Sequence, residues 1–363
     1  MKLFRINLIT LYYLLAILIS GLFYSYATTR IVSFTDVSPF FILVISGSID
    51  ILIFIDLVYL HKLSILSSRT LSIITSVFLI LFFLISIFDA SVFVLFSLFA
   101  FCAGMFAYHL RYYEEKIILT KKKMSLGLVN ISLLQNISKL LGFGLGAYLY
   151  KITLQNYIVI LICLFLLFAF VNVKEDQKID LKYKLSLKKL NNKKNLLIMS
   201  LLSTTAVFWI PILVTEFNEN NLIEFAAIPF VAPGIFTVAY LKYFHNKYPV
   251  TNNKKDVSLF YLILTITFFI IQLFGGFLIL KTVLFSCIVP FIVAINISLN
   301  TEFMESNTDK TNNKVLLQII SVFSAIGTII LSFLAIYLNF IPYFILLLNM
   351  FVAIVVIYMK GSD

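Results

Sequence analysis

Three ionisable side chains lie deep within apolar stretches of the sequence. Asp50 and Asp56 fall inside the apolar segment Ser38–Leu60, and Lys139 falls near the middle of Leu126–Tyr150. A charge at bilayer depth is costly and is usually paired or functional. A rise of about 1.5 Å per residue places Asp56 roughly 9 Å beyond Asp50 and about 240° around the helix, so the two carboxylates do not share a face. We therefore expect ion pairing or proton transfer here, with no metal site and no cofactor.

Asp50 and Lys139 are expected at similar depths, and two interpretations of them stay open. In the structural interpretation, the two side chains form an ion pair within the first half of the chain. In the functional interpretation, Asp50 carries a proton. The two are compatible, because a carboxylate beside a lysine can alternate between a paired and a protonated form.

These side chains belong to a chain whose composition is that of a membrane protein. Hydrophobic residues make up 61% of it and charged residues 12%, and the mean hydropathy is +1.03, far from the values of soluble domains. A spanning helix needs about 20 mostly apolar residues. Twelve segments qualify, and the shortness of some turns leaves eleven as an alternative. They are Ile6–Tyr26, Ser38–Leu60, Thr70–Phe88, Ser91–Tyr113, Leu126–Tyr150, Gln155–Val173, Asn195–Thr215, Leu222–Phe244, Val257–Gly275, Thr282–Thr301, Val315–Tyr337 and Ile341–Met359.

The charged residues predict how these segments are oriented. With the N-terminus inside, 24 of the 28 Lys and Arg fall in inside loops and three in outside loops, and Lys139 is intramembrane. Cytoplasmic loops of membrane proteins carry such an excess, so both termini are predicted to be cytoplasmic. The same bias explains the net charge of +11 without a nucleic-acid partner. Residues 174–194, with eight lysines, form the longest polar run. We interpret them as a cytoplasmic linker between a six-helix bundle over 1–173 and another over 195–363.

The fifth segment carries a pattern of small residues. Ser138, Gly142 and Gly146 recur every four residues and share one face of a helix, where small side chains let two backbones approach closely. Such a pattern also occurs in any tight helix contact. It resembles the fifth-helix motif of drug–proton antiporters of the major facilitator superfamily, with Phe143 in place of the motif proline and Ala147 in place of its last glycine. The motif of that superfamily in the loop after helix two is not present, and only Arg69 fits it.

The six-plus-six plan also resembles this superfamily, and the resemblance implies an architecture. Helices one, four, seven and ten would line a central cavity, and helices two, five, eight and eleven would form the interface between the halves. Access to a site at mid-membrane would then alternate as one half rocks against the other. The expected fold is thus an all-α membrane protein with 12 transmembrane helices in two bundles.

Several polar and aromatic residues are candidates for lining such a cavity. They are Tyr24, Thr205, Trp209 and Asn296, with His109 and Arg111 at the inner mouth of helix four. Aromatic residues in membrane helices more often serve packing, and the His109 region also fits an anchor at the membrane interface.

These features favour a secondary active transporter. No Gly-x-x-x-x-Gly-Lys-Ser/Thr nucleotide-binding motif is present, so the chain itself does not hydrolyse ATP by that route. The leading hypothesis is proton-coupled export, as an efflux antiporter, of a small amphipathic metabolite, peptide or drug. The chain would act as a monomer in the cytoplasmic (inner) membrane of a bacterium, with the lipid bilayer and the substrate as its partners. The alternatives are a flippase for lipid-linked saccharides and a membrane-embedded transferase. The transferase is disfavoured because Asp50 and Asp56 lack the spacing of a metal-binding pair, so we do not expect an enzyme.

Overall fold

The computed structural model describes most of the chain, in seven continuous stretches and a few isolated positions. The stretches are residues 8–34, 38–60, 124–148, 189–244, 254–309, 313–338 and 340–359, and the isolated positions are 70, 73–74, 77–78, 80–81 and 114. The predicted segment Gln155–Val173, most of the two segments between 70 and 113, and most of the linker lie outside the described residues.

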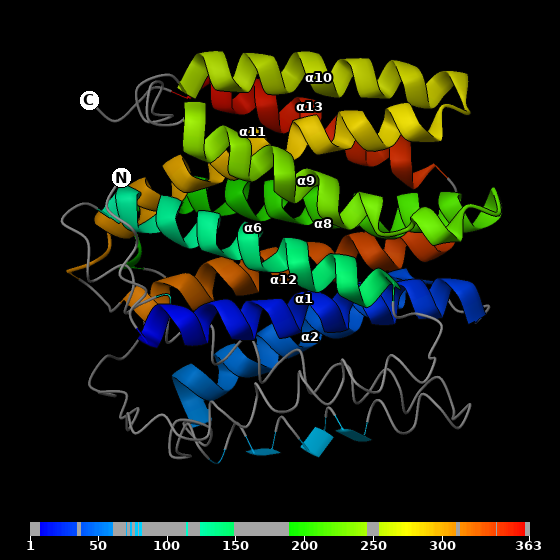
Figure 1. Ribbon diagram of the computed structural model, residues 1–363. Helices are drawn as coiled ribbons and strands as arrows, with labels where there is room; N and C mark the ends of the chain where they lie inside the picture. Colours follow the sequence, from blue (N-terminus) through cyan, green and yellow to red (C-terminus); the bar gives the residue numbers. More distant parts are fainter. Residues whose placement is uncertain are drawn as a thin grey trace.

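The described chain is helical, and it contains long apolar rods packed side by side (Figure 1). Eight of its helices are long and apolar enough to cross a membrane. The first-half helices are α1 (Leu8–Phe34), α2 (Phe40–Ile55, continued by a π-helical turn Asp56–Leu60) and α6 (Met124–Tyr148). The second-half helices are α8 (Lys193–Glu219), α9 (Ile228–Ala239, continued by a π-helical turn Tyr240–Phe244), α10 (Lys254–Phe274), α11 (Leu278–Glu305), α12 (Asn313–Tyr337) and α13 (Ile341–Tyr358).

Two boundaries differ from the sequence-based expectation for physical reasons. α1 continues to Phe34 instead of ending at Tyr26, because the hydroxyls of Thr28 and Ser33 donate to helix carbonyls four residues back and are thereby satisfied inside the helix. The segment predicted to begin at Leu222 starts with a 3₁₀ turn, and α9 begins only at Ile228. Pro229 lies at the first turn of α9, where its missing N–H costs nothing.

The contacts fix how the helices run relative to one another. The side chain of Asn218, near the end of α8, donates to the carbonyl of Val32, near the end of α1. α1 and α8 therefore begin at one end of the bundle, the near end, and finish at the opposite, far end. Glu302, close to the end of α11, accepts a hydrogen bond from Asn195 near the start of α8 and pairs with Lys254 at the start of α10. α10 therefore also begins at the near end, and α11 finishes there.

Two helix pairs make the most extensive contacts between the first half and the second within the described residues. α2 packs against α12, and α6 packs against α9. Gln318 of α12 donates to the backbone carbonyl of Asp50 at 3.2 Å, and Gly234 of α9 lies against Leu140 of α6. These four are the second, eleventh, fifth and eighth predicted helices. The described contacts therefore agree with the interface that the family resemblance implies.

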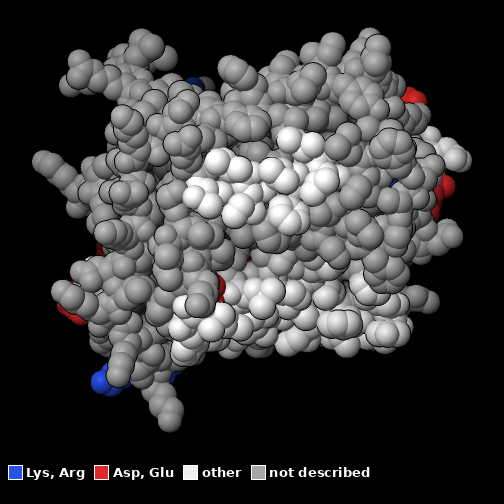
Figure 2. All heavy atoms as spheres, turned by 90° about the horizontal axis from the view of Figure 1, so that it is seen from below, with Lys and Arg blue, Asp and Glu red and all other residues white. Residues whose placement is uncertain are grey.

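Charged residues concentrate at the two ends of the bundle. In Figure 2 most of the acidic and basic atoms lie at the left and right margins, and uncharged residues cover the described surface between them apart from a small acidic patch. The second half is fastened by an ion pair at each end. Lys254 and Glu302 lie 3.1 Å apart at the near end, and Lys281 and Glu216 lie 3.0 Å apart at the far end. An apolar middle with polar ends is the pattern of a multi-pass membrane protein.

Candidate functional site: a cavity between the two halves

A cavity of about 620 Å³ lies between the two halves of the chain. Both halves line it, with α1, α2 and α6 on one side and α8, α9, α11 and α12 on the other. Its volume falls within the usual range of small-molecule sites, about 300–1,000 Å³. A cavity bounded by both halves changes shape whenever one half moves relative to the other.

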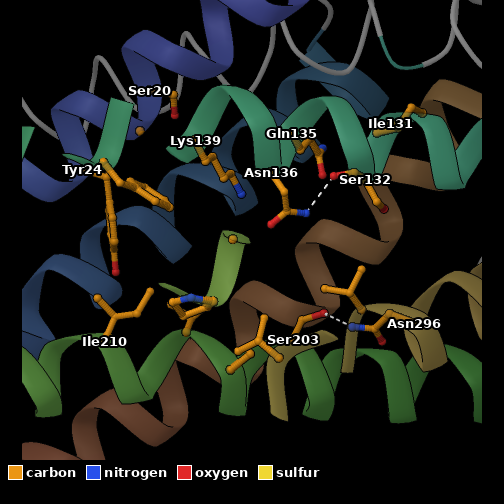
Figure 3. Close-up of a pocket in the computed structure, with 18 of the residues that line it drawn as sticks. Ser20, Tyr24, Ile131, Ser132, Gln135, Asn136, Lys139, Ser203, Ile210 and Asn296 are labelled. Atoms are coloured by element: carbon orange, nitrogen blue, oxygen red, sulfur yellow. Dashed lines mark hydrogen bonds between the residues drawn. The ribbon is translucent and has the colours of Figure 1, made fainter. Parts of the chain in front are cut away.

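The charged lining residues in the described part of the chain all come from the first half. They are Asp50 of α2, Lys139 of α6 and Glu114. Asp50 is half-buried, and the side chain of Lys139 is exposed and extends from α6 towards α8 in Figure 3. The structure places Asp50 and Lys139 in the lining of one cavity. Their direct pairing remains a prediction.

Glu114 is a lining residue that the sequence interpretation missed as a site candidate. Its side chain is only 2% exposed, and Oε1 accepts hydrogen bonds from the Tyr13 hydroxyl at 3.3 Å and from Gln135 Nε2 at 2.7 Å. In the sequence it stands in the polar run after helix four, so it suggests an interfacial charge. No glycine or proline separates Tyr113 from Glu114, so the sequence allows the same helix to continue through Glu114. That continuity is the signal that could have indicated a position inside the bundle.

Carboxamide side chains form a second polar set in the cavity. Gln135 and Asn136 come from α6, and Asn296 and Asn300 come from α11. The Asn136 amide donates to the carbonyl of Ser132 at 2.7 Å, and the Asn296 amide donates to the hydroxyl of Ser203 at 3.3 Å. Figure 3 shows these two pairs on opposite sides of the cavity. The rest of the second-half wall is mostly apolar, so the cavity is amphipathic.

Aromatic rings close the far end of the cavity. Tyr24 of α1, Phe143 of α6 and Phe230 of α9 pack in a mutual cluster with ring centroids 5.5–6.3 Å apart. Beyond them, Ala147 of the first half packs in one buried apolar cluster with residues that include Val214 of the second. We call Tyr24, Phe143 and Phe230 the aromatic plug. It places an apolar barrier between the cavity and the far end.

The cavity is displaced towards the near end. Its lining includes Leu128 and Leu317, each one turn from the start of its helix at the near end, and Asn300, little more than a turn from the end of α11. On α1 and α8 the lining stops at Tyr24 and Ile210, more than two turns before these helices finish, and on α6 and α9 it stops at Phe143 and Phe230 of the aromatic plug. Less protein therefore separates the cavity from the near end than from the far end.

Of the residues predicted to line a cavity, the structure places some in the lining and others elsewhere. Tyr24 and Asn296 line it. Thr205 is buried and donates to the carbonyl of Leu202, and Trp209 is buried against Phe268 with ring centroids 4.4 Å apart.

The cavity expectation for Thr205 and Trp209 is thus not met in this structure. Ser203, two positions before Thr205 and about 200° away around the helix, takes the lining position on α8. Asp56 is buried in the π-helical turn after α2 and does not line the described cavity. His109 and Arg111 lie outside the described residues.

The small-residue face of α6 packs against α1. Ser138, Gly142 and Gly146 are all buried, and a Cβ atom on Gly142 or Gly146 would overlap the backbone of α1. The motif therefore makes the close backbone contact that its spacing indicates. The contact lies within the first half, while Leu140 on another face of α6 meets the second half.

Comparison with known proteins identifies the fold. No protein-family model matches the sequence, and no curated protein matches it in sequence. Solved structures do match. The human organic anion transporter MFSD10 (TETRAN) aligns with a TM-score of 0.57 at 12% identity, over 95% of this chain and 99% of that one. The nucleoside transporter NupG aligns with a TM-score of 0.60 at 14% identity, over 97% of this chain and 98% of that one.

These two proteins are transporters of the major facilitator superfamily. The resemblance noted in the sequence is therefore confirmed at the level of the fold, over nearly the full length of the chain. The chain is a multi-pass, all-α membrane protein with the architecture of these transporters. Neither similar structure is an enzyme. Since identity is low and the named substrates of the two proteins differ, the fold alone does not specify what this chain binds.

Proposed function

We propose that the protein is a secondary active transporter that exports a small amphipathic molecule by alternating access, with the proton gradient as its energy source. The observation that carries this proposal is the cavity between the halves, which both halves line and whose described lining holds three ionisable groups. A site bounded by two bodies becomes accessible from each side in turn when the bodies rock.

Proton coupling is assigned to Asp50, with Lys139 as its partner. Both line the cavity, and the backbone carbonyl of Asp50 also accepts the hydrogen bond of Gln318 from the second half. A carboxylate that alternates between an ion pair and a protonated form changes the charge of the cavity by one unit. Protonation of this carboxylate would therefore change the charge of the cavity at a residue that also contributes a backbone carbonyl to the α2–α12 contact.

The distribution of positive charge supports a conformation in which the cavity is accessible from the cytoplasm. Lys189, Lys193 and Lys194 lie before or at the start of α8, and Lys254 and Lys255 lie at the start of α10, all at the near end. We therefore assign the near end and both termini to the cytoplasm, following the excess of positive charge in cytoplasmic loops. The aromatic plug then faces outward, and the cavity lies towards the side from which an exported substrate arrives.

A transport assay tests the proposal. Inverted membrane vesicles containing the protein are supplied with a panel of labelled metabolites, peptides and drugs, with and without an imposed proton gradient. We expect gradient-dependent uptake of at least one compound, and we expect Asp50→Asn to remove the dependence on the gradient while the protein is still produced.

Asp56→Asn is the matched control, because it removes a buried carboxylate from the same helix region without altering the cavity lining. It is expected to retain coupled uptake. Normal coupled uptake by the Asp50→Asn variant would exclude Asp50 as the proton carrier. A lack of flux for every compound, in either direction and with or without the gradient, would contradict transport itself.

A further inference from the structure

The polar groups of the cavity are unevenly divided between hydrogen-bond donors and acceptors. Asn136 directs its amide nitrogen to the carbonyl of Ser132, and Gln135 directs its amide nitrogen to the carboxylate of Glu114. A backbone carbonyl and a carboxylate only accept, so these partners dictate which end of each carboxamide faces them. The oxygens of Gln135 and Asn136 consequently face elsewhere. No hydrogen bond from the described part of the chain reaches them.

The opposite wall also presents buried acceptors. On α11 the amide nitrogen of Asn296 is engaged with Ser203, while the buried Oδ1 atoms of Asn296 and Asn300 have no hydrogen-bond partner within the described residues. An unsatisfied buried acceptor is costly, and it gains most when a donor is supplied. Asparagines four residues apart share one face of a helix, so a single donor-bearing group can serve both.

The charged side chains of the cavity lining also favour a ligand that donates hydrogen bonds. Its described lining holds two carboxylates, on Asp50 and Glu114, and one ammonium, on Lys139. With all three ionised the lining carries a formal charge of −1. Lys139 supplies donors only, and it is the predicted partner of Asp50. A ligand that brings a positive charge and hydrogen-bond donors therefore complements the described lining.

We propose that the cavity binds a primary or secondary amine, whose N–H groups donate to the carboxamide oxygens of α6 and α11 and whose apolar or aromatic body lies against the aromatic plug. The proposal rests on the proposed function only in treating this cavity as the transport site. An ammonium group brings up to three donors and one positive charge, which offsets the charge of the lining. A quaternary ammonium brings the same charge and no donor, so it separates the two contributions.

Binding to the purified full-length protein in lipid nanodiscs tests this proposal, with matched probes that share one body. The probes are 2-(1-naphthyl)ethylamine, its N,N,N-trimethyl derivative, and 3-(1-naphthyl)propionate as the anion, with phenyl and octyl sets built in the same way. We expect each primary amine to bind at least about tenfold more tightly than its trimethyl derivative, since a hydrogen bond to a charged group contributes about that factor. We expect the anions to bind least.

Two variants test where the amine is held. Asn136→Leu removes an acceptor from α6, and Asn296→Leu removes one from α11. Each is expected to weaken the primary amine about tenfold and to leave the trimethyl derivative unchanged. Ile137→Leu, next to Asn136 on α6 but outside the cavity lining, is the matched control and should bind like the parent protein.

The two asparagines lie on different helices, so one variant remains informative if the other fails to fold. A panel in which no primary amine binds more tightly than both its trimethyl derivative and its anion would overturn the proposal. So would unchanged amine affinity in a folded Asn296→Leu or Asn136→Leu protein. Neither result bears on transport, which the vesicle assay decides separately.

Discussion

The contact between α1 and α6, within the first half, differs in kind from the contact between α6 and α9, which joins the halves. On α1 and α6 the backbones meet, because Gly142 lies against the carbonyl of Leu18 and Gly146 against the carbonyl of Leu22, with no room for a Cβ atom. Between the halves, Gly234 of α9 lies against the end of the Leu140 side chain, where an added Cβ would be 2.9 Å from Cδ2. A side-chain terminus can rotate away, whereas a backbone carbonyl in a helix cannot.

This difference indicates which parts move together. Backbone-to-backbone packing at small residues holds two membrane helices as one body, because close packing supplies the attraction that the bilayer does not. Contacts through flexible side chains can be exchanged for others at small cost. α1 and α6 are therefore expected to move as a unit, and the α6–α9 contact is expected to be remade in each transport cycle.

The largest effect is expected from Gly146→Ala. The added methyl group would overlap both the Leu22 carbonyl and the Ser25 hydroxyl, so α1 and α6 must separate, at a cost of about 3 kcal/mol. The measurement is the thermal unfolding of the purified variant in detergent. Gly144→Ala is the matched control on the same helix, because its Cβ would lie 3.6 Å from Val231, an ordinary contact. Equal stability of the two variants would show that the α1–α6 contact is looser than described.

A smaller effect on stability, but a clear effect on transport, is expected from Gly234→Ala. The new methyl group displaces the Leu140 side chain and costs about 1 kcal/mol, yet it obstructs a contact that must slide. We expect the transport rate to fall several-fold while the unfolding temperature changes little. Adding Leu140→Ala makes room for the methyl group and should restore the rate. A double variant as slow as Gly234→Ala alone would refute the sliding contact.

The smallest effect is expected from Asn218→Leu at the far end. The last carbonyls of a helix lack partners in their own helix, and the Asn218 amide satisfies that of Val32 across the two halves at 3.2 Å. Loss of this hydrogen bond costs about 1 kcal/mol. The equilibrium between a closed and an open far end therefore shifts about fivefold towards the open conformation. Asn220→Leu is the control, because that amide bonds within its own helix, to Glu216. Cysteine accessibility at the far end, before and after the change, measures the shift.

Hydropathy in the sequence predicted the described helices well, because spanning length is a property of single segments. The sequence placed Asp50 and Lys139 at one depth, and the structure places both on one cavity. The sequence did not predict which face of an almost wholly apolar helix lines the cavity. Thr205 and Ser203 look equivalent in the sequence, and only the packing of α8 against its neighbours turns Ser203 inward.

Glu114 was missed for a related reason. Its neighbours in the sequence are charged and suggest a solvated helix end, while its burial depends on Tyr13 and Gln135, which are distant in sequence. Likewise, the spacing of Gly142 and Gly146 predicted a close helix contact, but the identity of the partner, α1, is set by the three-dimensional arrangement.

Distances between paired spin labels test the central claim, that two rigid halves rock about the cavity. Labels replace exposed residues in a variant whose three cysteines are changed to serine. One pair spans the halves at the far end, Tyr148 and Phe225, and one spans them at the near end, Leu60 and Lys255. A third pair, Phe274 and Tyr337, lies within the second half. Between acidic and alkaline buffer, we predict that the far-end distance lengthens as the near-end distance shortens, or the reverse, while the third stays constant. Far-end and near-end distances that change in the same sense, or not at all, would contradict the account.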